Sequence, residues 1–229
     1  MFRCATASLL WVFFAAAPAV AQIAAPAPPG PYVVDLRGVT SAIPLDAAFF
    51  PPVPKGTSVP SRGYGVEVGA HVYLISLGPA RLGVGASLLR VRGGASPASP
   101  SSGSSPTAAV TPSVDAALTV IAPQLSFNFG SAAGWSYLSA GVGRARITSV
   151  TSAFGGGGAE ASVTPAGEAN SGMLPSLNIG GGARWFAKAR LGVSFDVRVH
   201  KMSPGISGDT GQSTPRTTVM AASVGISVR

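Results

Sequence analysis

The chain has 229 residues, and 16 lysines and arginines against 8 acidic residues give it a formal net charge of +8. Only 10% of its residues are charged, against about a quarter in soluble domains, while 46% are hydrophobic and the mean hydropathy is +0.39. The hydrophobic content argues against disorder, and after residue 21 no apolar run reaches the ~20 residues of a spanning helix. Apolar residues diluted by small and polar ones at short range are typical of β-barrels and β-sandwiches.

Residues 1–21 predict a secretory signal peptide. Arg3 supplies a positive start, and residues 4–17 are almost wholly apolar. Ala19-Val20-Ala21 then gives the small-x-small pattern of a cleavage site before Gln22. The segment is too short and has the wrong flanks for a membrane anchor, so we expect export and cleavage.

The sole cysteine, Cys4, lies within this signal segment, so the mature chain is expected to have none. Disulfides, thiol catalysis and cysteine-based metal sites are therefore excluded from the mature protein. Residues 22–30, rich in alanine and proline, predict a flexible lead-in. Residues 31–229 then form the single expected domain.

Beyond the lead-in, eight segments place apolar residues at alternate positions, the pattern of a strand with two different faces. The odd-numbered positions from Leu191 to Val199 are apolar, for example, whereas the even-numbered ones include Asp196 and Arg198. Pro123 predicts a bulge or a strand boundary, because proline cannot donate to a sheet ladder. The eight expected strands are residues 31–37, 64–74, 80–92, 118–129, 135–147, 176–185, 190–201 and 217–229.

The connections between these segments alternate between short and long. The short ones are residues 78–79, 130–134 and 186–188, and the long ones are residues 38–61, 93–117, 148–174 and 202–216. This alternation is the plan of an outer-membrane barrel, which has tight periplasmic turns and long extracellular loops. An even number of strands places both termini in the periplasm.

The polar faces predict the contents of the interior. A membrane barrel points its apolar faces at lipid and its polar faces inward. The polar faces here carry many glycines, which suit a narrow interior, and charges of both signs, which can pair. His71 and His200 share this inward parity and are expected to be hydrogen-bonded wall residues that do not meet. The expected interior charge network comprises Asp35, Arg37, Glu67, Arg81, Arg184, Asp196 and Arg198.

Two further groups of residues are expected at the membrane boundaries. Aromatic residues beside the short turns predict a periplasmic girdle: Tyr73, Phe127, Phe129, Trp135, Trp185 and Phe186. Basic residues with lipid-facing parity mark the outer strand ends, where arginine suits bidentate contact with lipopolysaccharide phosphates. This expected belt is Arg62, Arg90, Arg92, Arg144, Arg146, Lys201 and Arg216. A solvated rim without a ligand is the alternative reading.

With these patterns, and with glycine-rich strands such as Arg81-Leu82-Gly83-Val84-Gly85-Ala86, the chain resembles the eight-stranded outer-membrane β-barrel proteins of Gram-negative bacteria. The resemblance covers residues 31–229 and implies insertion by the outer-membrane assembly machinery. Such proteins usually end in an aromatic residue, whereas this chain ends Ser227-Val228-Arg229.

The expected protein is a monomeric all-β, eight-stranded antiparallel up-and-down transmembrane barrel. An eight-stranded barrel is just wide enough for its own side chains to fill, so no open pore is expected. No nucleophile elbow, metal-ligand spacing or basic stripe with interleaved aromatics is present, so we expect no enzyme activity, cofactor, metal or nucleic-acid partner. The expected role is structural or surface-interacting: envelope integrity, adhesion or lipopolysaccharide contact. A soluble lipocalin-like periplasmic carrier and a lipid-modifying barrel hydrolase remain as alternatives.

Overall fold

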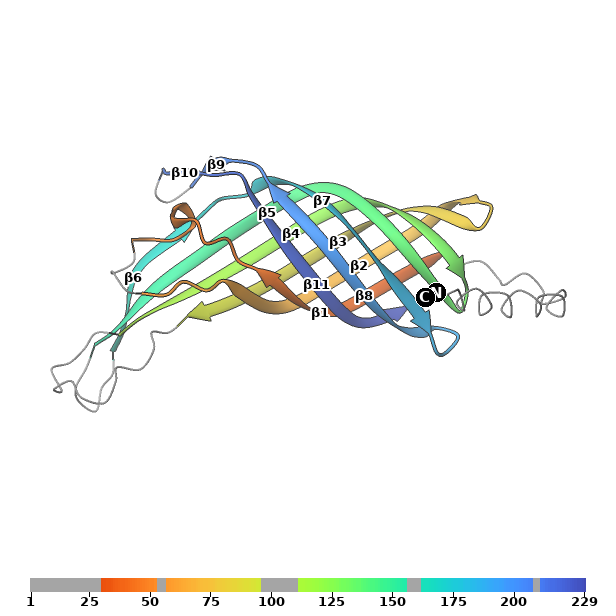
Figure 1. Ribbon diagram of the computed structural model, residues 1–229, viewed down its shortest axis with the longest axis horizontal. Coiled ribbons are helices and arrows are strands. Elements are labelled where there is room, and N and C mark those ends of the chain that lie inside the picture. The colour runs from red at the N-terminus through yellow and green to blue at the C-terminus, as the bar shows by residue number, and fades with distance from the viewer. Residues whose placement is uncertain (1–29, 53–56, 96–110, 156–161, 208–210) are drawn as a thin grey trace, which may run out of the picture.

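Eight strands form a closed antiparallel ring in the computed structural model, which describes residues 30–52, 57–95, 111–155, 162–207 and 211–229. Each strand pairs with its neighbour along the ring, and β1 closes the barrel against β11 (Figure 1). The ring strands are β1 (Tyr32–Ala42), β2 (Arg62–Leu77), β3 (Ala80–Ala95), β4 (Thr111–Ser131), β5 (Gly134–Gly155), β7 (Leu174–Phe186), β8 (Leu191–Met202) and β11 (Thr217–Val228). The predicted fold is thus confirmed, while the expected signal peptide and most of the lead-in lie outside the described residues.

The two ends of the barrel differ in their connections. Tight turns join β2 to β3, β4 to β5 and β7 to β8 at one end, which we call the turn end. Gly78 provides the left-handed backbone, φ 61°, that the first of these turns needs. β1 begins and β11 finishes at this end, where Val34 pairs with Val228. The opposite end, which carries the longer connections, is the loop end.

Several strands continue past the expected boundaries at the loop end. The predicted links at 93–117 and 148–174 are partly strand, because β4 and β5 stay paired as far as Thr111 and Phe154. A further strand, β6 (Ser162–Asn170), adds to β5, and β4, β5 and β6 project beyond the other strands (Figure 1). In the extended part of β4, Val114 and Ala116 point into the barrel and join its buried apolar cluster. The apolar face there is the inward one, opposite to the outward apolar face of a membrane-spanning strand.

The remaining elements also belong to the loop end. A short 3₁₀ helix, η1 (Ala47–Phe49), follows β1, and a small hairpin of β9 (Gly205–Ile206) and β10 (Ser213–Thr214) lies between β8 and β11. Among the described residues, no helix has the length and apolar character to cross a membrane.

The structure corrects the expectation for Pro123. This residue lies within β4, where it pairs with Ala86 of β3 in an unbroken register. Pairing to β5 is interrupted between Ile121 and Gln124, but the register is the same on both sides of the gap. The missing N–H of proline therefore removes ladder contacts without a bulge or a strand boundary. A register shift does occur in β2, between Tyr73 and Ile75.

The apolar faces point outward. Leu36, Val193 and Val224 are 51%, 56% and 67% exposed, whereas Asp35, Arg184 and Asp196 are at most 1% exposed. A soluble lipocalin-like carrier would require the reverse arrangement, with its apolar faces inward. An outer wall of apolar side chains around a polar middle is the arrangement of a transmembrane barrel.

Candidate functional site

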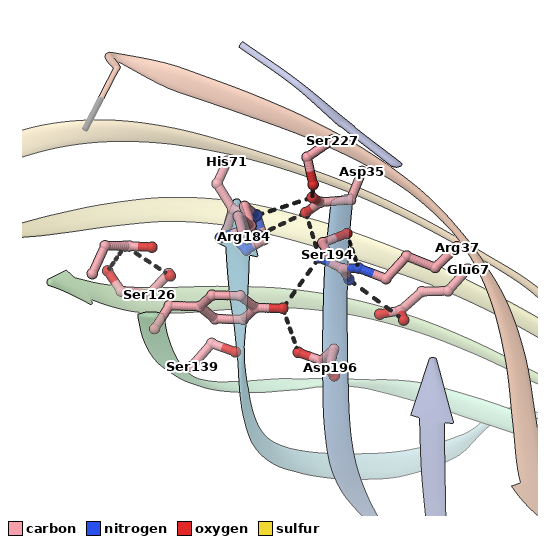
Figure 2. A network of polar contacts seen from close by, with 12 residues as sticks. Asp35, Arg37, Glu67, His71, Ser126, Ser139, Arg184, Ser194, Asp196 and Ser227 are labelled. Atoms are coloured by element: carbon pink, nitrogen blue, oxygen red, sulfur yellow. Dashed lines mark hydrogen bonds and ion pairs between the residues drawn. The ribbon is translucent and has the colours of Figure 1, made fainter. Parts of the chain in front are cut away.

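A layer of ion pairs crosses the middle of the barrel, and Asp35 of β1 lies at its centre (Figure 2). Arg184 of β7 donates to the two carboxylate oxygens of Asp35 from Nε and Nη2, at 2.9 and 2.6 Å. Arg37 makes a second ion pair with Asp35 at 2.7 Å, and Ser227 of β11 donates to the same carboxylate at 2.5 Å. One carboxylate therefore joins three strands.

Arg37 extends this layer toward β2 and β5. Its Nη1 lies 3.5 Å from the carboxylate of Glu67, which also accepts a 2.8 Å hydrogen bond from Ser223. Its Nη2 donates to the Tyr137 hydroxyl at 3.1 Å, and that hydroxyl donates to Asp196 at 2.7 Å. The Tyr137 hydroxyl thus links the Asp35 cluster to a second acidic centre.

The second centre is built around Arg198 of β8. Arg198 forms an ion pair with Asp196 at 2.9 Å and donates to the side-chain oxygens of Gln124 and Asn178 at 2.7 and 2.8 Å. The Gln124 amide nitrogen in turn lies 3.0 Å from Nε2 of His71. His71 is therefore a hydrogen-bonded wall residue, as expected. The same expectation is wrong for His200, whose two ring nitrogens are buried and have no hydrogen-bond partner within the described residues.

The charges of this layer balance. Asp35, Glu67 and Asp196 face Arg37, Arg184 and Arg198, and all six are at most 3% exposed. Unpaired charges at this depth would be strongly destabilising, so each group depends on its partners. Arg81, the seventh expected member, lies apart near the turn end: it is half-buried, and its backbone carbonyl accepts from Asn128.

The six expected girdle residues fall into two sets of three. Phe127, Phe129 and Trp185 lie on the outer face near the turn end, as a girdle requires. Tyr73 and Trp135, however, are 7% and 2% exposed inside the barrel. Their strand parity sets this direction, and proximity to a turn does not override it.

Tyr73 and Trp135 instead close the turn end together with Phe186. The Trp135 ring stacks on Phe186 with centroids 4.7 Å apart and meets Tyr73 edge-on at 6.3 Å. The guanidinium of Arg229 lies 4.2 Å from the Phe186 ring centre and donates to the carbonyls of Ala132 and Ala189. The unusual C-terminal arginine therefore caps an aromatic layer across the mouth of the barrel.

The loop-end half of the interior is apolar. Its buried cluster draws on seven strands of the ring, with residues such as Leu89, Leu118 and Ile147. Phe49 and Phe50, at the end of η1, turn into this cluster and are 2% and 6% exposed. Ser149 of β5 donates to the Phe49 carbonyl at 2.7 Å and holds the segment in place.

The expected basic belt is exposed throughout. All seven side chains lie on the outer surface toward the loop-end parts of their strands or the adjoining connections, and they are Arg62, Arg90, Arg92, Arg144, Arg146, Lys201 and Arg216. Arg144 donates to the Met173 carbonyl at 3.3 Å. The other six have no hydrogen bond or ion pair within the described parts of the chain.

The protein combines an outer apolar wall, a filled interior and a closed ring of eight strands. The fold is that of an eight-stranded transmembrane β-barrel. No family model and no curated protein matches the sequence.

Solved structures with a similar fold include Ail, the attachment invasion locus protein of Yersinia pestis, in complex with the heparin analogue sucrose octasulfate. Its sequence is 10% identical to this one, and the TM-score is 0.47. The match covers 86% of this chain and 96% of that chain. Neisserial surface protein A is 14% identical, with a TM-score of 0.48 over 87% and 97% of the two chains. The outer membrane protein OprG from Pseudomonas aeruginosa is 10% identical, with a TM-score of 0.47 over 89% and 97%.

The sequence did not identify Tyr137, Gln124 and Ser139 as partners of the charge layer. Their inward parity was readable, but which side chains meet across the lumen depends on the shear of the closed ring. The hydrolase alternative needs a histidine at the lipid face, whereas His71 and His200 are buried inside, at 3% and 1% exposure. The described residues contain no group of three or more His, Cys, Asp or Glu side chains arranged to hold a metal ion.

Proposed function

We propose that this protein is a non-enzymatic, monomeric outer-membrane β-barrel of a Gram-negative bacterium that stabilises the envelope by contact with lipopolysaccharide. In this proposal the turn end faces the periplasm and the loop end faces outward. The signal peptide directs export and is cleaved from the mature chain, and the assembly machinery of the outer membrane inserts the barrel.

The observation that carries the proposal is the exposure of the seven residues of the expected basic belt, which we call the basic rim from here on. Its seven cations are exposed on the outer surface at the loop end, where six of them lack a partner within the described residues. Arginine forms bidentate, charge-assisted hydrogen bonds with phosphate oxygens. Lipopolysaccharide supplies a dense layer of phosphates at the depth where these side chains would lie.

The filled interior supports a role other than transport. The aromatic layer capped by Arg229, the ion-pair layer around Asp35 and the apolar cluster under Phe49 follow one another along the barrel axis. Each layer consists of side chains in mutual contact. In this proposal the outer surface and the loops, rather than the lumen, meet the partners of the protein.

Charge reversal of the rim tests this function. A variant with Arg62→Glu, Arg90→Glu, Arg146→Glu and Lys201→Glu should co-purify with much less lipopolysaccharide than the parent protein. The matched control is Lys188→Glu with Arg190→Glu, because both residues are exposed but lie at the turn between β7 and β8. Unchanged lipopolysaccharide content in the rim variant would contradict the proposal.

A further inference from the structure

Four of the seven rim cations are concentrated on the two strands that flank β4. The register places Arg90 of β3, Thr119 of β4 and Arg146 of β5 in one row across the sheet. Arg144 lies one outward-facing position closer to the turn end on β5, and Arg92 one such position closer to the loop end on β3. Two strand spacings separate β3 from β5 by about 10 Å, so arginines from both sides can reach a ligand over Thr119.

A hollow in the outer surface adjoins this row on its loop-end side, where Arg92, Ala117 and Thr148 pair, and of the four arginines Arg90 and Arg92 line it. It has a volume of about 270 Å³ and is lined by residues that include Arg90, Arg92, Asp115, Ala117 and Thr148. Arg90 and Arg92 line its β3 side, Ala117 and Asp115 line its β4 side, and Thr148 lines its β5 side. Asp115 is the only acidic side chain lining this hollow, and it forms no ion pair within the described residues.

A second, apolar hollow lies further down the same strand. Its volume is about 490 Å³, and its lining includes Val84, Pro123, Leu125, Ala140 and Val142. Pro123 interrupts the pairing of β4 with β5 at this level, as described above. Four residues of strand separate Thr119 from Pro123, a distance of about 13 Å. The apolar hollow thus lies deeper in the membrane than the basic one.

We propose that β4 carries a specific lipid site, in which the basic hollow binds a phosphate of lipopolysaccharide and the apolar hollow receives one of its acyl chains. This inference rests on the proposed function and narrows it from a diffuse belt to one face. The basic hollow lies closer to the loop end and the apolar hollow lies closer to the middle of the barrel. This order matches a lipid that carries a phosphate in its head group and acyl chains that extend into the membrane. The loop-end position of the arginines matches the outer leaflet, where lipopolysaccharide lies.

The head-group part of the site is tested by two paired variants of the full chain in detergent. Arg90→Gln with Arg146→Gln should weaken binding of purified lipopolysaccharide by about tenfold or more, the loss of roughly one charge-assisted contact. The control, Arg62→Gln with Arg216→Gln, removes the same charge elsewhere on the rim and should change binding by less than about threefold. On a denaturing gel, a folded barrel migrates differently before and after boiling. The same difference in both variants would confirm that they are folded.

The outcomes separate the two proposals. Equal losses in both paired variants would support a diffuse belt and overturn the β4 site. No loss in either variant, together with unchanged binding by the charge-reversed rim variant, would overturn the proposed function as well. Loss confined to Arg90→Gln with Arg146→Gln supports both.

The acyl part is tested by filling the apolar hollow. Ala140→Phe places a ring on the outer face within the hollow and should weaken binding of intact lipopolysaccharide, while binding of its deacylated, phosphorylated core is retained. Ala222→Phe is the control, because it fills a comparable outer hollow of about 550 Å³ over β1, β2 and β11. Equal effects of the two phenylalanines, or equal losses for the intact and deacylated forms, would overturn the acyl assignment.

Discussion

Asp35 and Arg184 are 149 positions apart in the chain, yet the guanidinium donates two hydrogen bonds, at 2.9 and 2.6 Å, to the carboxylate in the middle of the barrel. Both side chains are completely buried, and Asp35 also pairs with Arg37. Removal of one partner from a buried ion pair leaves an uncompensated charge, which is far more costly than the pair itself is stabilising. The pair therefore makes barrel closure depend on correct registration of β1 against β7.

Asp35→Asn should accordingly lower the stability of the folded barrel, by about 3 kcal/mol or more. The change leaves Arg184 and Arg37 with one carboxylate fewer, so the buried layer acquires a net positive charge. Urea titration in detergent, followed by the fraction of unboiled protein that migrates as the folded form, measures the effect. Glu168→Gln, an exposed change on β6, is the control and should leave the midpoint in place; equal midpoints for the two variants would contradict the role of Asp35.

Deletion of Arg229 should open the turn end. The guanidinium stacks on Phe186 and binds two backbone carbonyls, so its loss removes a cation–π contact of about 0.5–2 kcal/mol and the hydrogen bonds with it. We expect the deletion variant to unfold at a lower temperature than the parent protein, as measured by the temperature at which the folded band on a denaturing gel is replaced by the unfolded band. Arg190→Ala, which removes an exposed cation from the neighbouring turn, should not produce this shift. Arg229→Phe tests whether a terminal aromatic residue replaces the cap.

Two interior glycines should differ sharply in their tolerance of alanine. A Cβ at Gly225 of β11 would overlap the backbone carbonyl of Leu36, which cannot move without distorting β1. A Cβ at Gly69 would lie 3.6 Å from the Asp35 carboxylate, an ordinary contact. Gly225→Ala should therefore destabilise the barrel by about 1–3 kcal/mol, whereas Gly69→Ala should fold normally. Similar unfolding midpoints for both would show that the interior is less tightly packed than described.

Phe49→Ala should weaken the loop end without opening a channel. The ring is 2% exposed within the apolar cluster, and its removal is expected to cost about 3–5 kcal/mol. The ion-pair layer below is unaffected, so planar lipid bilayers with this variant should show no conductance above that of the parent protein. A stable ion current through Phe49→Ala alone would mean that η1, and not the charge layer, seals the lumen.

Strand parity carried most of what the sequence could predict. It placed Asp35, Glu67 and Arg198 inside, because the side-chain period of two is fixed by the pleat. The expectation that apolar strand residues face outward is wrong in the loop-end half, where Leu89 and Leu118 point into the barrel. The partner of each charge was not predictable in the same way. Asp35 pairs with Arg184 as well as with the nearby Arg37, and the contact with Arg184 depends on ring closure and strand tilt, which local pattern does not encode.

The missed features have related causes. Phe49 and Phe50 lie in a segment without periodicity, so nothing in the sequence indicated that they turn into the lumen. The position of Trp135 beside a turn predicts a place in the girdle, but its strand parity directs the side chain inward. The extended part of β4 carries alternating apolar residues, Val114 and Ala116, but they point into the barrel, whereas the apolar face of a membrane-spanning strand points outward.

The chain folds as a closed barrel within a membrane. The most direct measurement is the mobility of the membrane-extracted protein, unboiled and boiled, on a denaturing gel. A closed barrel with this buried ion-pair layer should resist the detergent and shift in mobility only on boiling. Recovery of the protein in the aqueous fraction, with the same mobility before and after boiling, would contradict the account.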